Sequence, residues 1–217
     1  MKILFQGDSI TDVDRNRNDE KIPELEFPQL MGSGYPQLIA AKLGYEFPNK
    51  YEFVNRGISG NRVSDLLSRM RKDIIKVNPD VLSILVGVNE VGHEWLNGNS
   101  INAELYEEIY DLLIREVKKE LPHVRIMILE PFVLRGTATE EHFEQFQSEV
   151  FLHAKAAKRV AEKNSLEFIP LQKCFEEALK LAPANTWLVD GVHPTSAGHE
   201  LIAREWLKQF QNEMFRN

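Results

Sequence analysis

The stretch Phe5-Gln6-Gly7-Asp8-Ser9-Ile10-Thr11-Asp12 continues an apolar run that begins at Ile3. A short apolar run that ends in glycine is typical of a buried strand that breaks into a tight turn. We therefore expect Ser9 at the carboxyl end of a strand, the edge where open α/β sheets bind ligands. Thr11 and Asp12 favour a helix that begins just afterwards, whose unpaired amides favour negative charge near Ser9. The turn can hold a nucleophile, or it can be a glycine-stabilised turn whose polar side chains only bond the backbone.

Four further strand-like runs follow, and helical patterns separate them. The runs cover residues 51–55, 81–86, 124–129 and 166–169, and the helical patterns cover 35–43, closed by Gly44, then 63–76, 103–119, 140–163 and 173–181. Leu105, Leu112 and Val117 lie on the expected apolar side of the helix at 103–119. This alternation indicates right-handed βαβ units. It predicts an α/β fold, a three-layer sandwich with a mainly parallel five-stranded sheet between helices.

Size and composition fit one soluble globular domain over residues 1–217. Hydrophobic residues make up 43% and charged residues 27% of the chain, which is ordinary for such a protein. The formal net charge of −7 argues against nucleic acid or an anionic membrane as the main partner. The single cysteine, Cys174, excludes an internal disulfide, and we expect it to be a small apolar residue on a helix face. The lack of a secretory signal pattern predicts a cytoplasmic location.

Two glycine-rich or polar turns follow predicted strands. Residues 56–61 contain two glycines where a helix should begin, so Gly60 is a candidate backbone donor toward a ligand. Asn89 follows the run at 81–86 and could donate its side-chain amide, although asparagine also occupies turns for local bonding. Residues 13–34 are charged and broken by proline and glycine. A loop of that length beside Ser9 is either a substrate rim or a surface excursion.

Asp190 and His193 carry the strongest chemical signal. They lie three residues apart in a loop ahead of the last helix, which Thr195 or Ser196 can cap. At this spacing Asp190 can hold the proton on one ring nitrogen of His193 and leave the other nitrogen free as a base. Such pairs also occur as helix-capping loops. The other histidines are scattered and expected to be surface or packing residues, and we expect no metal site: His93, His123, His142, His153 and His199.

Four stretches resemble, in order and spacing, the four signature blocks of the SGNH hydrolases, also called GDSL esterases. They are Gly7-Asp8-Ser9-Ile10, residues 57–60, Gly87-Val88-Asn89-Glu90 and Asp190-Gly191-Val192-His193. The resemblance covers essentially the whole chain and implies a flavodoxin-like fold. It implies that Ser9 is the nucleophile, His193 the general base and acid, and Asp190 the residue that orients His193. The backbone N–H groups of Ser9 and Gly60 and the amide of Asn89 would form the oxyanion hole.

The resemblance has two departures and implies no metal or organic cofactor. Ile10 stands where the family has leucine, which should affect packing only. Glu90 stands where the third block normally has aspartate, which puts the bonds that support Asn89 in question. The absence of Gly-x-Gly-x-x-Gly and of Gly-Lys-Ser removes the usual reason to expect a nucleotide.

Within the family, the sequences of residues 32–35, 55–61 and 190–199 resemble those of the acetylxylan esterase branch. This implies deacetylation of a sugar or short oligosaccharide. Trp95 and Trp187 could stack on a sugar ring or could be core aromatics. Self-association is expected without any particular residue to indicate it.

Three alternative functions remain open at this point. A lysophospholipase or acyl-thioesterase of the same family should have a broad apolar groove, whereas the segment 13–34 is charged. An inactive ligand-binding protein would explain Glu90 as the mark of a decayed site. A flavodoxin-like phosphate or flavin binder would leave Asp190 and His193 without a role.

Overall fold

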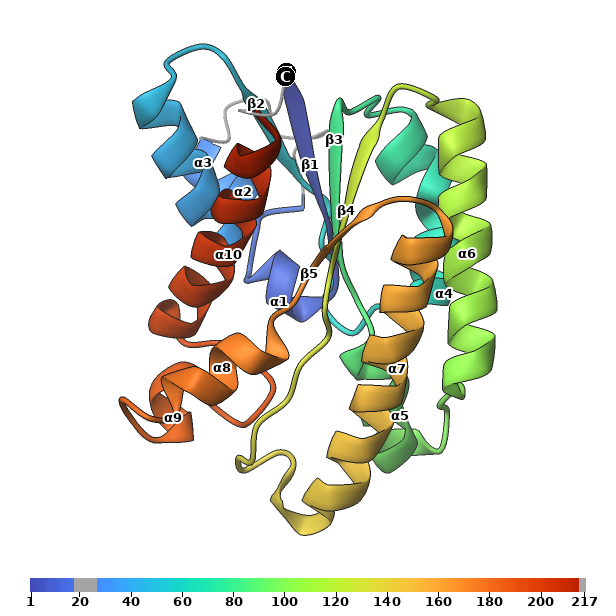
Figure 1. Cartoon of the computed structure of the whole chain (residues 1–217), viewed down its shortest axis with the longest axis vertical. Helices are drawn as coiled ribbons and strands as arrows, with labels where there is room; N and C mark the ends of the chain where they lie inside the picture. The colour runs from blue at the N-terminus through green and yellow to red at the C-terminus, as the bar shows by residue number, and fades with distance from the viewer. Residues whose placement is uncertain (18–26, 215–217) are drawn as a thin grey trace.

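Five strands lie side by side in one sheet in the described part of the chain (Figure 1). The computed structural model describes residues 1–17 and 27–214, apart from the side chains of residues 27–28, 94–97 and 212–214. The strands are β1 (Lys2–Gly7), β2 (Glu52–Asn55), β3 (Val81–Leu85), β4 (Arg125–Leu129) and β5 (Glu167–Ile169). Their order is β2-β1-β3-β4-β5, and each neighbouring pair is parallel. The predicted α/β fold with a parallel five-stranded sheet is confirmed.

Helices cover both faces of this sheet and complete three layers (Figure 1). One face carries α2 (Phe27–Met31), α3 (Tyr35–Glu46), α8 (Gln172–Ala178) and α10 (Ser196–Met214), with the short α9 (Ala184–Trp187) against α10. The other face carries α4 (Val63–Met70), α6 (Ala103–Glu120) and α7 (Phe143–Lys163). A π-helical turn, η1 (Arg71–Ile75), continues α4, and a 3-10 turn, η2 (Glu140–His142), precedes α7. Within the described residues, no helix is both long and apolar enough to cross a bilayer.

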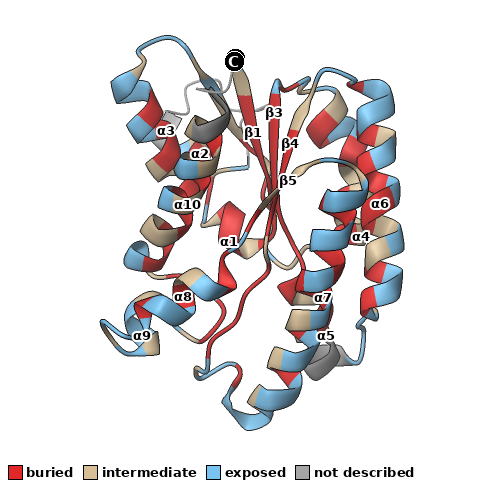
Figure 2. Ribbon diagram, in the orientation of Figure 1, coloured by how far each residue is buried: buried red, intermediate tan, exposed pale blue. Residues whose placement is uncertain are grey.

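The sheet is buried from both sides, as Figure 2 shows. Along β1, Ile3 and Phe5 belong to the core under α3 and α10, whereas Leu4 belongs to the core under α4 and α6. This alternation arises because successive side chains of a strand point to opposite faces. In β3, Ser83 accepts a hydrogen bond from the indole N–H of Trp206 in α10 at 3.0 Å. Both side chains are fully buried, so the bond ties the central strand to the last helix.

All five strands end at the same edge of the sheet because they are parallel. The single-turn helix α1 (Ser9–Asp12) follows β1, the loop of residues 56–62 follows β2, and α5 (Val88–Asn97) begins shortly after β3. The loop of residues 188–195 joins them from far along the chain. The N–H of Leu134, beyond β4, donates to Gly191 O, and the N–H of Ala138 donates to Asp190 O, both at 2.9 Å. Segments distant in sequence thus meet at this edge.

Some predicted elements have different boundaries. Helix α3 runs past Gly44 to Glu46, because the chain leaves the helical region only at Phe47, which precedes a proline. Residues 88–97 form α5 rather than an open turn. Phe27–Met31 form α2 inside the segment expected to be irregular, and residues 18–26 of that segment lie outside the described residues.

The buried side of α6 also differs from the predicted one. Leu105 and Leu112 are 44% and 38% exposed, whereas Tyr106 and Tyr110 are fully buried. The side of α6 that faces the sheet is therefore rotated about the helix axis from the side that the leucine pattern predicted. Only part of that stripe, including Val117, faces the sheet.

Candidate active site

Ser9, His193 and Asp190 form a chain of hydrogen bonds at the carboxyl edge of the sheet. Ser9 Oγ lies 3.0 Å from His193 Nε2, and His193 Nδ1 lies 2.7 Å from Asp190 Oδ2. An ionised carboxylate can only accept, so Nδ1 carries the proton and Nε2 can accept the proton of the Ser9 hydroxyl. The structure thus brings together the three residues that the sequence singled out. Their order is the one that serine nucleophilic catalysis requires.

The sharp turn between β1 and α1 holds Ser9. Gly7 is needed there because a Cβ at its position would lie 2.3 Å from Leu85 O and 2.5 Å from Thr11 Oγ1. Asp8 caps the turn, since its Oδ1 accepts the N–H of Ile10 at 3.0 Å. Burial raises the pKa of Asp8 to about 7, against the opposing effect of the bond from Ile10. The sequence predicted a helix just after Ser9. The observed helix, α1, is a single turn and begins at Ser9 itself.

Asp190 holds both the imidazole and the loop that carries it. Its Oδ1 accepts the backbone N–H groups of Val192 and His193 at 2.9 and 2.8 Å, while Oδ2 bonds the ring. Burial raises the pKa of Asp190, but the bonds from His193 and Val192 outweigh burial and hold that pKa well below its usual range. The bond to Asp190 in turn raises the pKa of His193. A charged Asp190 therefore stabilises a charged imidazolium beside Ser9.

Gly60 and Asn89 lie on two neighbouring segments at the same edge. Gly60 has a φ of +81°, and no atom lies within 4 Å of the place where its Cβ would be, so its backbone borders open space. Asn89 lies in the first turn of α5, and its Nδ2 donates to Asn61 O at 3.1 Å. An amide nitrogen carries two hydrogens, so Asn89 keeps a second donor. Their place in an oxyanion hole stays a prediction.

Glu90, the departure from the family aspartate, also contacts this region. Its side chain is fully buried, and Oε1 accepts the N–H of Val63, the first residue of α4, at 2.6 Å. Burial raises the pKa of Glu90 to about 8, and the bond from Val63 partly opposes this. Glu90 therefore fixes the start of α4 just beyond the loop that carries Gly60. The bond from Asn89 to that loop is present beside it.

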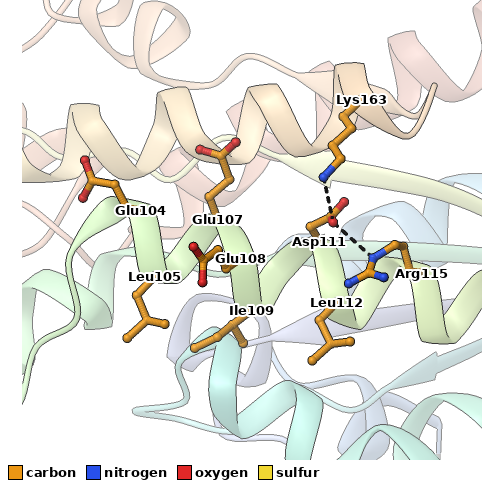
Figure 3. Close-up of a pocket in the computed structure, with 9 residues that line it drawn as sticks. All are labelled: Glu104, Leu105, Glu107, Glu108, Ile109, Asp111, Leu112, Arg115 and Lys163. Atoms are coloured by element: carbon orange, nitrogen blue, oxygen red, sulfur yellow. Dashed lines mark hydrogen bonds and ion pairs between the residues drawn. The ribbon is translucent and has the colours of Figure 1, made fainter.

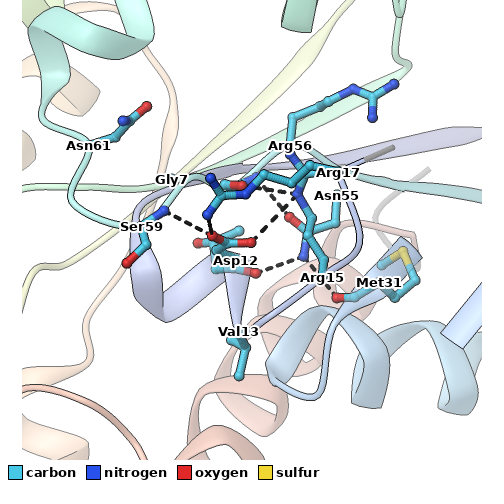
Figure 4. Close-up of polar contacts among 12 residues, drawn as sticks. Gly7, Asp12, Val13, Arg15, Arg17, Met31, Asn55, Arg56, Ser59 and Asn61 are labelled. Carbon is cyan, nitrogen blue, oxygen red and sulfur yellow. Dashed lines mark hydrogen bonds and ion pairs between the residues drawn. The ribbon is translucent and has the colours of Figure 1, made fainter. Parts of the chain in front are cut away.

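A polar cluster fastens the end of α1 to the loop after β2 (Figure 4). Asp12 Oδ2 accepts the N–H of Ser59 at 2.9 Å and also pairs with the guanidinium of Arg17. Asp12 is only 2% exposed, and Ser59 immediately precedes Gly60. The cluster therefore sets the position of the Gly60 backbone relative to Ser9. Sequence reasoning missed this cluster, although the charges directly after α1 were a signal.

A hollow of about 290 Å³ opens beside Ser9. Residues 13, 14 and 17, from the described part of the segment expected to form a rim, lie in its wall. His199 was expected to be a surface or packing residue, and it is only 4% exposed, yet it also lines the hollow. Its position six residues after His193, at the start of α10, was the available signal. The polar side chains in the wall include Asp12, Arg17, Ser59, His193 and His199.

Trp187 is not among the residues that line this hollow. Trp187 is partly buried, its indole N–H donates to Ala182 O at 3.2 Å, and its ring lines a separate apolar hollow with Cys174 and Leu201. The side chain of Trp95, in α5, lies outside the described residues. Trp187 is thus not in the wall beside Ser9, and the stacking of either tryptophan on a bound sugar stays a prediction.

A larger hollow, of about 620 Å³, lies on the outer side of α6 (Figure 3). Glu104, Glu107 and Glu108 line it, with Asp111 bonded to Lys163 at 2.9 Å. It contains none of the candidate site residues that the sequence singled out. Among the residues that the structure describes, no three His, Cys, Asp or Glu side chains are grouped as metal ligands.

Comparisons with known proteins show which sequences and structures this chain resembles. The model of the GDSL-like lipase/acylhydrolase family matches residues 5–201. The acetylxylan esterase of Geobacillus stearothermophilus is 32% identical over 219 residues, which cover 100% of this chain and 96% of the relative. A crystal structure of an acetylxylan esterase from that organism has a TM-score of 0.82 at 32% identity, over 95% of this chain and 92% of that chain. A candidate GDSL-like lipase from Parabacteroides merdae has a TM-score of 0.89 at 39% identity, over 95% and 94%.

Proposed function

Because the chain belongs to the GDSL-like lipase/acylhydrolase family and is a carboxylic ester hydrolase, we propose that it removes acetyl groups from a carbohydrate through a Ser-His-Asp triad. The observation that carries this proposal is the bonded chain from Ser9 Oγ through His193 to Asp190, which opens into a polar hollow. The likeness to an acetylxylan esterase over the full chain supports the acetyl and carbohydrate parts.

The proposed reaction has two steps on Ser9. His193 Nε2 takes the hydroxyl proton while Oγ bonds the ester carbonyl carbon, and the negative charge on the carbonyl oxygen is met by the N–H groups of Ser9 and Gly60 and by Asn89. The bond from the carbon to the alcohol oxygen then breaks, and His193 gives that oxygen the proton. Water, activated by the same His193, releases acetate from Ser9. Asp190 remains ionised and holds the ring in its tautomer throughout.

The wall of the hollow favours a polar alcohol. Asp12, Asp14, Arg17 and Ser59 offer hydrogen-bond donors and acceptors that a sugar can use and a hydrocarbon chain cannot. The wall therefore supports a hydroxyl-rich alcohol, and the likeness to an acetylxylan esterase supports the short acyl group.

The first test is hydrolysis of p-nitrophenyl esters from acetate to palmitate, and of acetylated xylo-oligosaccharides, by the wild type and Ser9→Ala. We expect the wild type to prefer acetate and to deacetylate the oligosaccharides, and we expect Ser9→Ala to lose both activities. Ser148→Ala, an exposed serine on α7, is the matched control and should retain them. A preference for long acyl chains would contradict the carbohydrate proposal, and equal rates in Ser9→Ala would contradict the triad.

A further inference from the structure

The hollow borders Ser9, His193 and His199. Gly60 and Asn89, two of the three expected oxyanion donors, are not in its wall. In the proposed reaction His193 gives its proton to the leaving alcohol, so that alcohol must lie next to His193. The hollow is therefore the space available to the alcohol part of the substrate.

His199 presents a fixed hydrogen-bond donor to this space. Its Nδ1 accepts the backbone N–H of Tyr35 at 3.2 Å, so in the neutral ring the proton resides on Nε2. The ring is 4% exposed, and burial, with the nearby charge of His193, lowers its pKa to about 4. Because Nδ1 is turned to the backbone while the ring lines the hollow, Nε2 is the atom that can donate into it.

The backbone around His199 is shaped to hold the ring in this place. A Cβ at Gly34 would lie 2.9 Å from His199 Cε1 and 2.5 Å from Val13 Cγ2, so only glycine lets the three segments meet. The ring of Tyr35 stacks on that of His199 with 6.4 Å between centroids. A side chain with so little freedom loses little entropy when it binds a ligand, which favours selective recognition.

We infer that the hollow binds the sugar of the ester and that His199 donates a hydrogen bond from Nε2 to one of its oxygens. This inference rests on the proposed function and deepens it, because it assigns the residue that distinguishes a hydroxyl-rich alcohol from an apolar one. A buried donor left without an acceptor is unfavourable, so an alcohol that lacks an oxygen at that place is rejected.

The test uses two amides that each reproduce one nitrogen of the ring. His199→Asn keeps an acceptor near the place of Nδ1 and loses the donor at Nε2, whereas His199→Gln keeps a donor near Nε2 and loses the acceptor. The readout is the ratio of kcat/KM for an acetylated methyl xyloside to kcat/KM for p-nitrophenyl acetate, whose alcohol carries no hydroxyl group. We expect this ratio to fall about tenfold or more in His199→Asn and less than about threefold in His199→Gln.

Two other results would overturn the inference. An equal fall for both substrates in His199→Asn would mean that His199 has only a structural role, and so would a larger change of the ratio in His199→Gln than in His199→Asn. His142→Asn, an exposed histidine of η2, is the matched control and should leave the ratio unchanged. If the wild type itself does not hydrolyse the acetylated xyloside, the proposed function fails, which is distinguishable from a failure of the role of His199.

Discussion

The imidazole of His193 must be neutral to take the proton of Ser9. The bond to Asp190 raises the pKa of His193 above the ordinary 6.5, so the charged and inactive form persists to higher pH. We expect kcat/KM for p-nitrophenyl acetate to fall as pH drops, with a midpoint above 6.5. Asp190→Asn should move this midpoint down and lower kcat on the order of 10⁴-fold. A profile that stays flat between about pH 8 and 5 would exclude His193 as the base.

A second residue-scale prediction concerns Asn89. If one of its amide hydrogens meets the oxyanion while the other bonds Asn61, Asn89→Ala should lower kcat about 100-fold with a smaller change in KM. The measurement is steady-state kinetics on p-nitrophenyl acetate, with Asn185→Ala, an exposed asparagine of α9, as the control. An effect confined to KM would place Asn89 outside the oxyanion hole.

At the scale of elements, the two glycines in and before α3 differ in whether the structure has room for a side chain. Gly44 lies inside α3 with open space where its Cβ would be, whereas Gly34 precedes α3 and is in close contact with Val13 and His199. We expect Gly44→Ala to raise the free energy of unfolding by about 0.5–1 kcal/mol. Gly34→Ala should lower it by about 1–3 kcal/mol, because the added methyl group overpacks the contact.

Urea unfolding of the two alanine variants and the wild type measures both effects. Gly34→Ala should also reduce esterase activity, since the contact it disturbs forms part of the wall beside Ser9. A Gly34→Ala variant as stable as Gly44→Ala would contradict the close packing of these segments.

The elements that the sequence did not predict are those without a clear apolar period. Helix α5 begins at Val88, and Asn89 and Glu90 follow. This polar first turn resembles a loop until the tertiary bond from Val63 is known. Helix α3 was expected to end at Gly44, because glycine often ends helices, yet the nearby Pro48 decides the boundary. In α6 the spacing of the leucines is that of an apolar helix face, but Tyr106 and Tyr110 are the residues that pack into the core.

At the scale of the whole molecule, a buried polar contact joins the sheet to the last helix within an apolar core. Ser83→Ala removes the acceptor of the Trp206 indole N–H, so we expect the free energy of unfolding to fall by about 1–3 kcal/mol. Urea unfolding measures this change, and Ser148→Ala on the surface of α7 should change stability by less than about 0.5 kcal/mol. If Ser83→Ala leaves the free energy of unfolding unchanged, another group accepts the hydrogen bond of the Trp206 indole.

Local patterns were enough to predict the parallel sheet. Parallel strands deliver their following turns to one edge, and Asp190 and His193 are only three residues apart, but the pairing of His193 with Ser9 rested on the resemblance to the SGNH hydrolases. The hollow beside Ser9 and the separate apolar hollow that Trp187 lines could not be predicted, since they depend on contacts between segments far apart in the chain. His199 was expected to be a surface or packing residue, and its place in the wall of the hollow could not be predicted for the same reason.

The separation of 184 positions between Ser9 and His193 has a consequence for protein synthesis. β1 emerges from the ribosome early. Its neighbours in the sheet, β2 and β3, follow later, and the loop that completes the site comes near the end, just ahead of α10. Every shorter nascent chain carries the serine without its base. The esterase can therefore gain activity only after translation has passed residue 193, and the appearance of ester hydrolysis during cell-free translation would report completion of the fold.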